Sequence, residues 1–327
     1  MAGPASAQQP YKTEYKLSAA IGTAYPWGKG AELWAQLIRE RSAGRIAVRL
    51  FPAGSATAGD LTGEFAALRD GAIDLAVGSA LNWSASVPTL NLFGLPFLFP
   101  NAKALDAVLQ GRVGTEILQR VAESGVVPLA WGDNEPREMS TTDRALRKPE
   151  DIAGIRIRIT GPAIVEETIA ALGATPVRMK WIDAQKALTE RSLGGQETNL
   201  AVYVATKAHT LGQKQVTLWG FAADPLIFAV SKRAWEGWSE ADRALVRQAA
   251  IEAAQRELVL ARAASEAASA TIGLALRGNG VVLHRLTQEE RAAFIQKTKP
   301  VFDKWAALIG TDLVVRAQDA YAAQPGR

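Results

Sequence analysis

Apolar and polar residues along the first half of the chain follow two periods, one typical of strands and one typical of helices. Runs that alternate at every second residue predict strands at 15–20, 46–52, 73–77 and 126–131. Runs with apolar residues at every third or fourth position predict helices at 30–42, 64–71 and 102–123. Because strands and helices take turns along the chain, this order predicts a parallel sheet with helices on both faces.

The second half of the chain repeats this order. Its strands are predicted at 154–159, 175–179, 200–204, 215–219, 226–231 and 281–286. Its helices are predicted at 162–172, 183–191, 238–276 and 288–309. At about 1.5 Å per residue, the helix at 238–276 spans tens of ångströms, which is more than one small domain needs. A chain of 327 residues is long enough for two domains, so we predict an α/β protein whose long helix connects two lobes.

The strand at 154–159 carries the first candidate chemistry. Three isoleucines alternate with Arg156 and Arg158, so the isoleucines face a core and both arginines lie on the opposite face. The Thr-Gly-Pro sequence that follows ends the strand and opens a helix. In an open α/β sheet, ligands bind beside such strand ends, and the first N–H groups of a helix favour an anion. Taken alone, the pattern also fits an edge strand with solvated arginines.

A second arginine, Arg137, follows the predicted strand at 126–131 in a polar loop. Two guanidinium groups near one cleft repel each other unless an anion lies between them. A carboxylate can accept two parallel hydrogen bonds from one arginine, which makes it a fitting anion. The pair Arg137 and Arg158 therefore predicts a site for an organic acid.

Two glycine-containing loops follow strands, and each carries a tryptophan, Trp27 and Trp83. Both loops lie at the carboxyl ends of parallel strands, where they would face one cleft. Together with Trp181 and Trp219 these side chains would enclose the apolar body of a ligand. The alternative is that Trp27 and Trp83 are packed in the core, because tryptophan is mostly buried on average.

Composition narrows the function classes. Hydrophobic residues make up 48% of the chain and charged residues 21%, and the net charge of +4 is spread without a dense basic block. This argues against nucleic-acid binding, and no apolar run is long enough to predict a transmembrane helix. The chain has no cysteine, and its two histidines, His209 and His284, lie far apart in the sequence. We therefore predict no catalytic residues, no metal site and no cofactor.

The beginning of the chain contains a small-x-small motif at Ala5-Ser6-Ala7. This motif has the form of a signal-peptide cleavage site, although no hydrophobic signal core precedes it. Either it is the remnant of an export signal that has been removed, or the match arises by chance.

Nine stretches, taken together and in this order, resemble the extracytoplasmic solute-binding subunits of tripartite ATP-independent periplasmic (TRAP) transporters, of the dicarboxylate-binding type. The stretches are 30–38 (GAELWAQLI), 44–52 (GRIAVRLFP), 68–75 (LRDGAIDL), 95–99 (LPFLF), 131–137 (WGDNEPR), 149–158 (PEDIAGIRIR), 171–174 (ALGA), 195–197 (GQE) and 286–291 (LTQEER). The resemblance implies a two-lobed periplasmic-binding-protein fold with a hinge between the lobes and a long bridging helix. The implied ranges are 10–132 and 223–255 for lobe I, 133–222 and 256–315 for lobe II, and tails at 1–9 and 316–327.

The resemblance also implies site residues. The arginine that pairs with the substrate carboxylate in the family corresponds to Arg158, and a second arginine used by many members corresponds to Arg137. The family often has Asp-Gly-Gln-Glu-Asn-Pro where this chain has Gly-Gly-Gln-Glu-Thr-Asn at 194–199, so the polar contact falls to Thr198 or Asn199. The other candidate ligand-binding residues are Ser79, Asn82, Trp83, Trp27 and Trp219.

The function implied by the resemblance is capture of an organic acid between two lobes in the periplasm, followed by delivery to a TRAP membrane permease. The chain would then not be an enzyme. Two alternatives are a sensor that presents the acid to a membrane receptor and an α/β enzyme that acts on a carboxylic acid. A C4-dicarboxylate, a 2-oxo or hydroxy acid and an aromatic acid all fit a cleft of arginine and tryptophan, and the tryptophans favour a monocarboxylate with an apolar or aromatic body.

Overall fold

The first sheet is built mainly from the N-terminal part of the chain. The structure, a computed structural model, describes residues 11–322, so the Ala5-Ser6-Ala7 motif and the end of the predicted tail lie outside the described residues. The strand order is β2-β1-β3-β10-β4, and β1 pairs in parallel with both β2 and β3. These strands are β1 (Tyr15–Ala19), β2 (Val48–Phe51), β3 (Leu75–Ser79), β4 (Val126–Asp133) and β10 (Pro225–Ser231).

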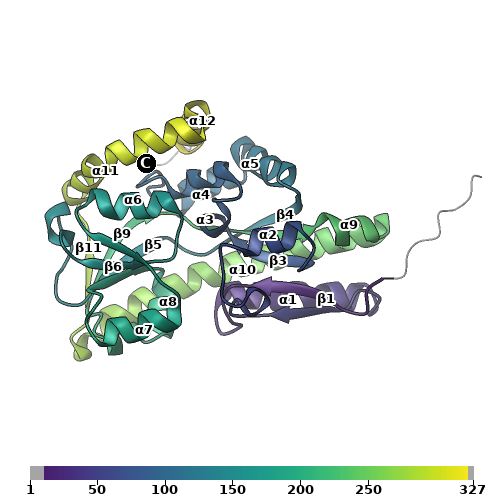
Figure 1. Cartoon of the computed structure of the whole chain (residues 1–327), viewed down its shortest axis with the longest axis horizontal. Helices are drawn as coiled ribbons and strands as arrows, with labels where there is room; N and C mark the ends of the chain where they lie inside the picture. Colours follow the sequence, from purple (N-terminus) through teal and green to yellow (C-terminus); the bar gives the residue numbers. More distant parts are fainter. Residues whose placement is uncertain (1–10, 323–327) are drawn as a thin grey trace, which may run out of the picture. The chain divides into compact units, whose positions relative to one another are not determined.

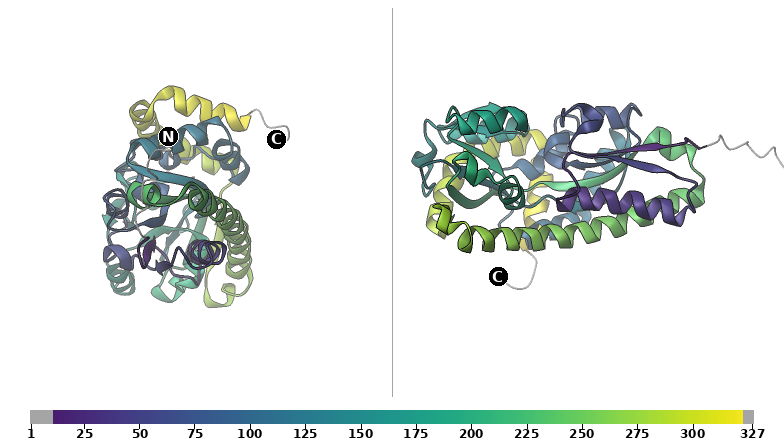
Figure 2. Two further views of the ribbon diagram at one scale, coloured as in Figure 1. Left: turned by 90° about the vertical axis from the view of Figure 1, so that its right-hand side faces the viewer. Right: turned by 90° about the horizontal axis from the view of Figure 1, so that it is seen from below.

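Two long helices cover this sheet together. Helix α1 (Pro26–Arg41) runs beside the first part of α10 (Glu240–Leu274), as the right-hand view of Figure 2 shows. Trp34 of α1 is fully buried between them, and its indole nitrogen donates a hydrogen bond to the carbonyl oxygen of Val246, 3.2 Å away. Alanines dominate the contact face of α10 and let the two helices approach closely. The shorter helices here are α2 (Glu64–Arg69) and α9 (Lys232–Gly237).

The second sheet has the order β11-β9-β5-β8-β6-β7. Its members are β5 (Arg137–Thr141), β6 (Arg156–Ile159), β7 (Thr175–Arg178), β8 (Gly195–Thr198), β9 (Gln215–Ala222) and β11 (Val282–Arg285). Strand β6 is parallel to β7 and β8, whereas β5 is antiparallel to β8 and β9. The sheet is therefore mixed, which differs from the predicted all-parallel arrangement, because the segment 137–141, predicted as a polar loop, forms β5.

Helices flank this second sheet on both sides. Figure 1 shows α6 and α11 on one side of the strands, and α7 and α8 on the other. The bounds of these four helices are α6 (Ala163–Ala171), α7 (Trp181–Thr189), α8 (Leu200–Ala205) and α11 (Gln288–Ile309), and the other helices of the chain are α3 (Ala80–Trp83), α4 (Ala102–Leu109), α5 (Arg112–Glu123) and α12 (Thr311–Ala322). Short 3-10 turns are η1 (Ser55–Thr57), η2 (Pro88–Gly94), η3 (Pro149–Ile152), η4 (Ala208–Leu211) and η5 (Arg277–Asn279).

The chain divides into two compact units, each with one of the sheets. Unit 1 comprises 1–78, 121–132 and 226–259, and unit 2 comprises 79–120, 133–225 and 260–327. The segment 79–120, predicted in the first lobe, thus groups with unit 2, because η2 packs against α6, α11 and β9, and α4 packs against α12. The predicted long helix is present as α10, which has 35 residues and contributes to both units.

Three further local predictions were wrong, each for a physical reason. The segment 200–204, predicted as a strand, forms helix α8, because the Asn199 side chain accepts a hydrogen bond from the Val202 N–H and so caps a helix. The predicted tail from 316 continues as helix α12 to Ala322, whose buried face includes Leu313 and Ala317. The loop predicted around Trp27 is the start of α1, with Pro26 at its first position.

Candidate functional site

Arg158 is the third residue of β6, at the end of the strand that the sequence singled out. Only 7% of the residue is exposed, and its Nε donates a hydrogen bond to the carbonyl oxygen of Met179, 3.1 Å away. No hydrogen bond among residues 11–322 uses its two terminal nitrogens. Met179 thus fixes the plane of the guanidinium and leaves the two nitrogens that bind carboxylates in a fork geometry without a protein partner.

Trp181 lies against the same guanidinium group. The central carbon of the Arg158 guanidinium is 5.8 Å from the centroid of the Trp181 ring, a cation–π contact. Met179 lies in the short connection between β7 and α7, and Trp181 is the first residue of α7. The same connection therefore supplies both contacts to Arg158. The sequence analysis named Trp181 only as one possible wall of a site, because the contact depends on how β7 and α7 lie beside β6.

Arg137 is the first residue of β5 and forms a buried ion pair. Its Nε donates to Oε2 of Glu197 at 2.7 Å, and a terminal nitrogen lies 2.6 Å from the same oxygen. The other oxygen of Glu197 accepts hydrogen bonds from the N–H and the hydroxyl of Thr160, at 3.0 and 3.1 Å. Glu197 is 1% exposed, so Arg137 and Thr160 together satisfy a fully buried carboxylate.

The two arginines lie on β5 and β6, which flank β8, and their electrostatic surroundings differ. Burial is the main reason that the pKa of Arg158 is lowered to about 10; the charge of Glu197 opposes this fall, and the charge of Arg137 makes a smaller contribution to it. Burial also lowers the pKa of Arg137, but the charges of Glu197 and Asp224 outweigh it, so that pKa is raised. Arg158 is therefore a buried cation without its own counter-ion, and a bound anion would supply one.

A polar network occupies several of the predicted site residues. Nδ2 of Asn199 donates to both oxygens of Asn134, at 3.0 and 2.9 Å, while its own oxygen caps α8. The Asn134 amide donates to Asp224, and Asp224 also accepts from Ser79 and from the Leu81 N–H. The side chains of Asn199 and Ser79 thus have partners within unit 2.

The remaining predicted site residues lie elsewhere. Trp27 belongs to unit 1, and its indole nitrogen donates to the carbonyl oxygen of Val77 at 2.7 Å. Trp83 and Trp219 are 0% and 1% exposed, and Trp219 packs edge-on against Phe97 and Phe294. Asn82 is partly exposed in α3, and Thr198 faces the side of β8 opposite to Glu197, because successive residues of a strand alternate.

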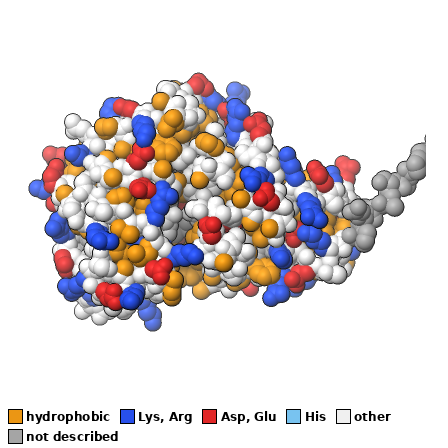
Figure 3. Space-filling view, in the orientation of Figure 1, with side chains coloured by type: hydrophobic (Ala, Val, Ile, Leu, Met, Phe, Trp, Pro, Cys, Tyr) orange, Lys and Arg blue, Asp and Glu red, His pale blue; other side chains and the backbone are white. Residues whose placement is uncertain are grey.

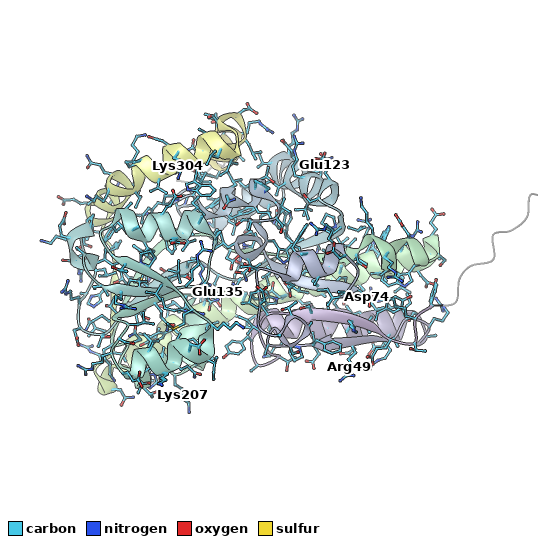
Figure 4. All side chains as sticks on the ribbon, viewed as in Figure 1. Arg49, Asp74, Glu123, Glu135, Lys207 and Lys304 are labelled. Carbon is cyan, nitrogen blue, oxygen red and sulfur yellow. The ribbon has the colours of Figure 1, made fainter. Side chains whose placement is uncertain are left out.

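Buried carboxyl groups accumulate before and within β5. Burial raises the pKa of Glu135 to about 8, with smaller opposing effects from hydrogen bonds with Ser265 and Ala201. Oε2 of Glu135 has no hydrogen-bond partner, and the residue has a left-handed backbone with φ of 62°. In Figure 4, Glu135 lies inside the outline of the ribbon, whereas Lys207 and Lys304 lie at its outer edge. The sequence analysis missed Glu135, because its burial arises from segments far apart in the chain.

Three further features of the described residues concern surface charge, the composition of the helices and the grouping of side chains that bind metals. On the face shown in Figure 3, basic and acidic side chains are interspersed. Within residues 11–322, no helix combines the length and the apolar composition needed to cross a bilayer. The same residues contain no group of three or more His, Asp or Glu side chains placed to hold a metal ion.

Comparison with known proteins decides the family. The sequence profile of "bacterial extracellular solute-binding protein, family 7" matches residues 17–308. The chain belongs to this family. A TRAP periplasmic solute-binding protein from Ralstonia eutropha H16, solved with bound (S)-2-acetolactate, is 50% identical, with 96% of this chain and 100% of that chain covered and a TM-score of 0.92.

More distant relatives of this family-7 protein agree with the assignment. The C4-dicarboxylate-binding periplasmic protein DctP from Rhodobacter capsulatus is 28% identical over 94% of this chain and 90% of its own. A TRAP periplasmic solute-binding protein from Sulfurospirillum deleyianum with bound succinate is 27% identical, with 93% and 98% of the two chains covered and a TM-score of 0.85. The predicted α/β periplasmic-binding-protein fold of the TRAP type is confirmed, and so is the predicted membership of a solute-binding family.

Proposed function

We propose that this family-7 protein binds a short, branched 2-hydroxy-3-oxo monocarboxylate of the acetolactate type, with Arg158 as the anchor of its carboxylate. The observation that supports the anchor is the buried guanidinium of Arg158, which has two terminal nitrogens without a protein partner. A carboxylate accepts both of them in parallel and neutralises a charge that burial otherwise makes costly. Trp181, which stacks on the same guanidinium, adds an apolar surface for the body of the acid.

The ligand class rests on the relative solved with bound acetolactate. That protein shares 50% of its residues with this chain, whereas the relatives solved with succinate or sugar acids share 22–27%. Sequence similarity at this level favours acetolactate-type ligands over dicarboxylates and sugar acids. Arg137, already paired with Glu197, acts in this proposal through its charge and through its unoccupied nitrogen rather than as the main anchor.

In the cell, the protein would work in the periplasm and hand its acid, chemically unchanged, to the membrane permease of a TRAP transporter. The support is its family: relatives are named periplasmic binding proteins, and the family binds solutes. No enzymatic turnover of the acid is part of this proposal.

Thermal unfolding against a panel of acids tests the ligand and the anchor together. The panel contains (S)-2-acetolactate, lactate, pyruvate, succinate, glucuronate and phenylacetate. A ligand present at about 100 times its Kd stabilises the folded state by about 2.7 kcal/mol, so acetolactate is expected to raise the melting temperature most. Unchanged acid recovered from the complex by mass spectrometry is expected as well.

Two variants of the same strand locate the anchor. Arg158→Ala is expected to abolish the shift, because the buried carboxylate loses its partner. Arg156→Ala, two residues earlier on β6 and exposed to solvent, is the matched control and is expected to keep it. If Arg158→Ala bound acetolactate as tightly as the control, the anchor would be misassigned. A larger shift with succinate or glucuronate would overturn the ligand class.

A further inference from the structure

An open cavity of about 740 Å³ lies within unit 2, away from the two arginines of the candidate site. Its walls come from β9, β11, the start of α4, the far part of α10 and the start of α11. This volume falls within the range of about 300–1,000 Å³ that is typical of small-molecule sites. None of the residues Arg137, Arg158 and Glu197 lines it.

Strand geometry separates the cavity from the carboxylate site. Successive side chains of a strand point to opposite faces of the sheet. On β5, Arg137 pairs with Glu197 on one face, and its neighbour Glu138 lines the cavity on the other face. The cavity is therefore a separate feature of the same sheet.

Glu138 lies in the wall of this cavity, and only one of its two carboxyl oxygens accepts hydrogen bonds from the described residues. The residue is 9% exposed, and its Oε2 accepts hydrogen bonds from the N–H groups of Trp219 and Gly220, each at 2.8 Å. Its Oε1 takes no hydrogen bond from the described residues. Burial raises the pKa of this carboxyl to about 7, although the two N–H groups and the nearby arginines Arg291 and Arg285 oppose the rise. Since Oε1 has no partner among the described residues and Glu138 lies in the cavity wall, a bound polar group can hydrogen-bond to it.

Charges of both signs line the cavity, so the wall as a whole favours neither a simple cation nor a simple anion. Arg285 and Arg291 lie in the wall, so a cation would meet two guanidinium groups. Glu138 and Glu266 lie there too, so an anion would meet two carboxyl groups. Arg291 is already engaged, since it donates to the carbonyl oxygens of Trp219 and Phe99 and lies over the Phe97 ring. Burying an ion next to a like charge costs free energy.

The rest of the wall indicates which neutral group fits. The apolar side chains Leu200, Leu218 and Leu283 supply a surface for a small hydrocarbon body. A hydroxyl group both donates and accepts a hydrogen bond, so it pairs with the free oxygen of Glu138 whether that carboxyl is ionised or protonated. An uncharged alcohol satisfies the polar atom, the apolar wall and the mixed charges together.

We propose that this cavity is a second ligand site, which binds an uncharged small molecule with at least one hydroxyl group on an apolar body, such as a short-chain diol. This site is independent of the acetolactate proposal, and its ligand would bind without displacing the organic acid.

Ligand-detected NMR titration of the full chain tests the proposal. The probes are 2,3-butanediol and 1,2-propanediol, with 2-hydroxybutanoate and sec-butylamine as an anion and a cation of similar size. The measurement is made in the Arg158→Ala background, so that the carboxylate site does not contribute. Saturable binding of the diols, without equal binding of the two charged compounds, is the expected result. Failure of both diols to bind, or equal binding of a charged compound, overturns the proposal.

Three variants locate the binding. Gly273 lines the cavity, and a Cβ built there meets no atom within 4 Å, so the backbone accepts a side chain; Gly273→Trp places a large ring at the cavity wall and is expected to abolish diol binding. Gly278 also has open space but does not line the cavity, so Gly278→Trp is the matched control and is expected to bind normally. Glu138→Gln keeps an acceptor for the two N–H groups and is expected to bind diol about fivefold more weakly, since hydrogen bonds to charged groups are stronger. Unchanged affinity in Gly273→Trp places the binding elsewhere and overturns the assignment.

Discussion

Arg137 and Glu197 form a buried ion pair between β5 and β8, with Nε and Oε2 separated by 2.7 Å. The sequence analysis assigned Arg137 to the ligand, but in the structure this side chain holds two strands together. Thr160, at the end of β6, binds the other oxygen of the same glutamate. Glu197 therefore links three neighbouring strands, β5, β8 and the end of β6, which carries Arg158.

The ion pair predicts a large effect on stability. Glu197→Ala leaves the Arg137 guanidinium buried and unpaired, so the free energy of unfolding is expected to fall by about 3–5 kcal/mol in a urea titration. Glu190→Ala is the control, because its pair with Lys186 is exposed and 3.9 Å long, and it is expected to change stability by less than about 1 kcal/mol. Equal losses in the two variants would contradict this role.

The fork geometry of Arg158 predicts that lysine cannot replace it. Arg158→Lys keeps the positive charge but loses the parallel pair of donors and the contact with Met179. Losing one charged hydrogen bond of about 1.5–3 kcal/mol is expected to weaken binding of the acid by roughly tenfold to a hundredfold in calorimetry. Wild-type affinity in this variant would mean that charge alone, and not geometry, selects the carboxylate.

The stacking of Trp181 on Arg158 predicts an effect on affinity without a matching effect on stability. Trp181→Leu removes the cation–π contact and is expected to lower the affinity for the acid by about 0.5–2 kcal/mol. Trp235→Leu in unit 1, which removes a similar contact with Arg247, is the control for changes unrelated to the site. The comparison is made by calorimetry and by thermal unfolding, and an equal loss of affinity in both variants would count against Trp181.

Glu135 predicts a pH dependence of stability. Its pKa is raised to about 8 by burial, so between the ordinary pKa of a glutamate and about pH 8 the folded state binds more protons than the unfolded state. Stability from this group is therefore present at low pH and is lost as the pH rises through that window, at up to about 1.4 kcal/mol per pH unit. In Glu135→Gln, the slope of the unfolding free energy against pH between pH 5 and pH 8 is expected to become shallower by up to the contribution of one proton, about 1.4 kcal/mol per pH unit. An unchanged slope would show that Glu135 is not the group responsible.

The elements that the sequence predicted well are those with a clear local period. The strand around Arg158 has isoleucines on alternate positions, and α10 has a long run of alanine, glutamate and arginine, so short-range pattern is enough to identify both. The strand β5 escaped prediction because its five residues, Arg137–Thr141, are polar apart from one methionine and yet buried. Their polar groups are satisfied by partners such as Glu197 and Gln213, which lie far away in the sequence.

By itself, the sequence determined the α/β class, the long helix and the family, because each depends on local periodicity or on motifs read in order; it also predicted Arg158 as the anchor of the ligand. Only the tertiary structure decided what each side chain does. It paired Arg137 with Glu197, placed Trp181 against Arg158 and engaged Asn199 with Asn134. These roles depend on which donors and acceptors the folded chain brings within about 3 Å of one another, and hydrogen bonds and ion pairs form only at such distances.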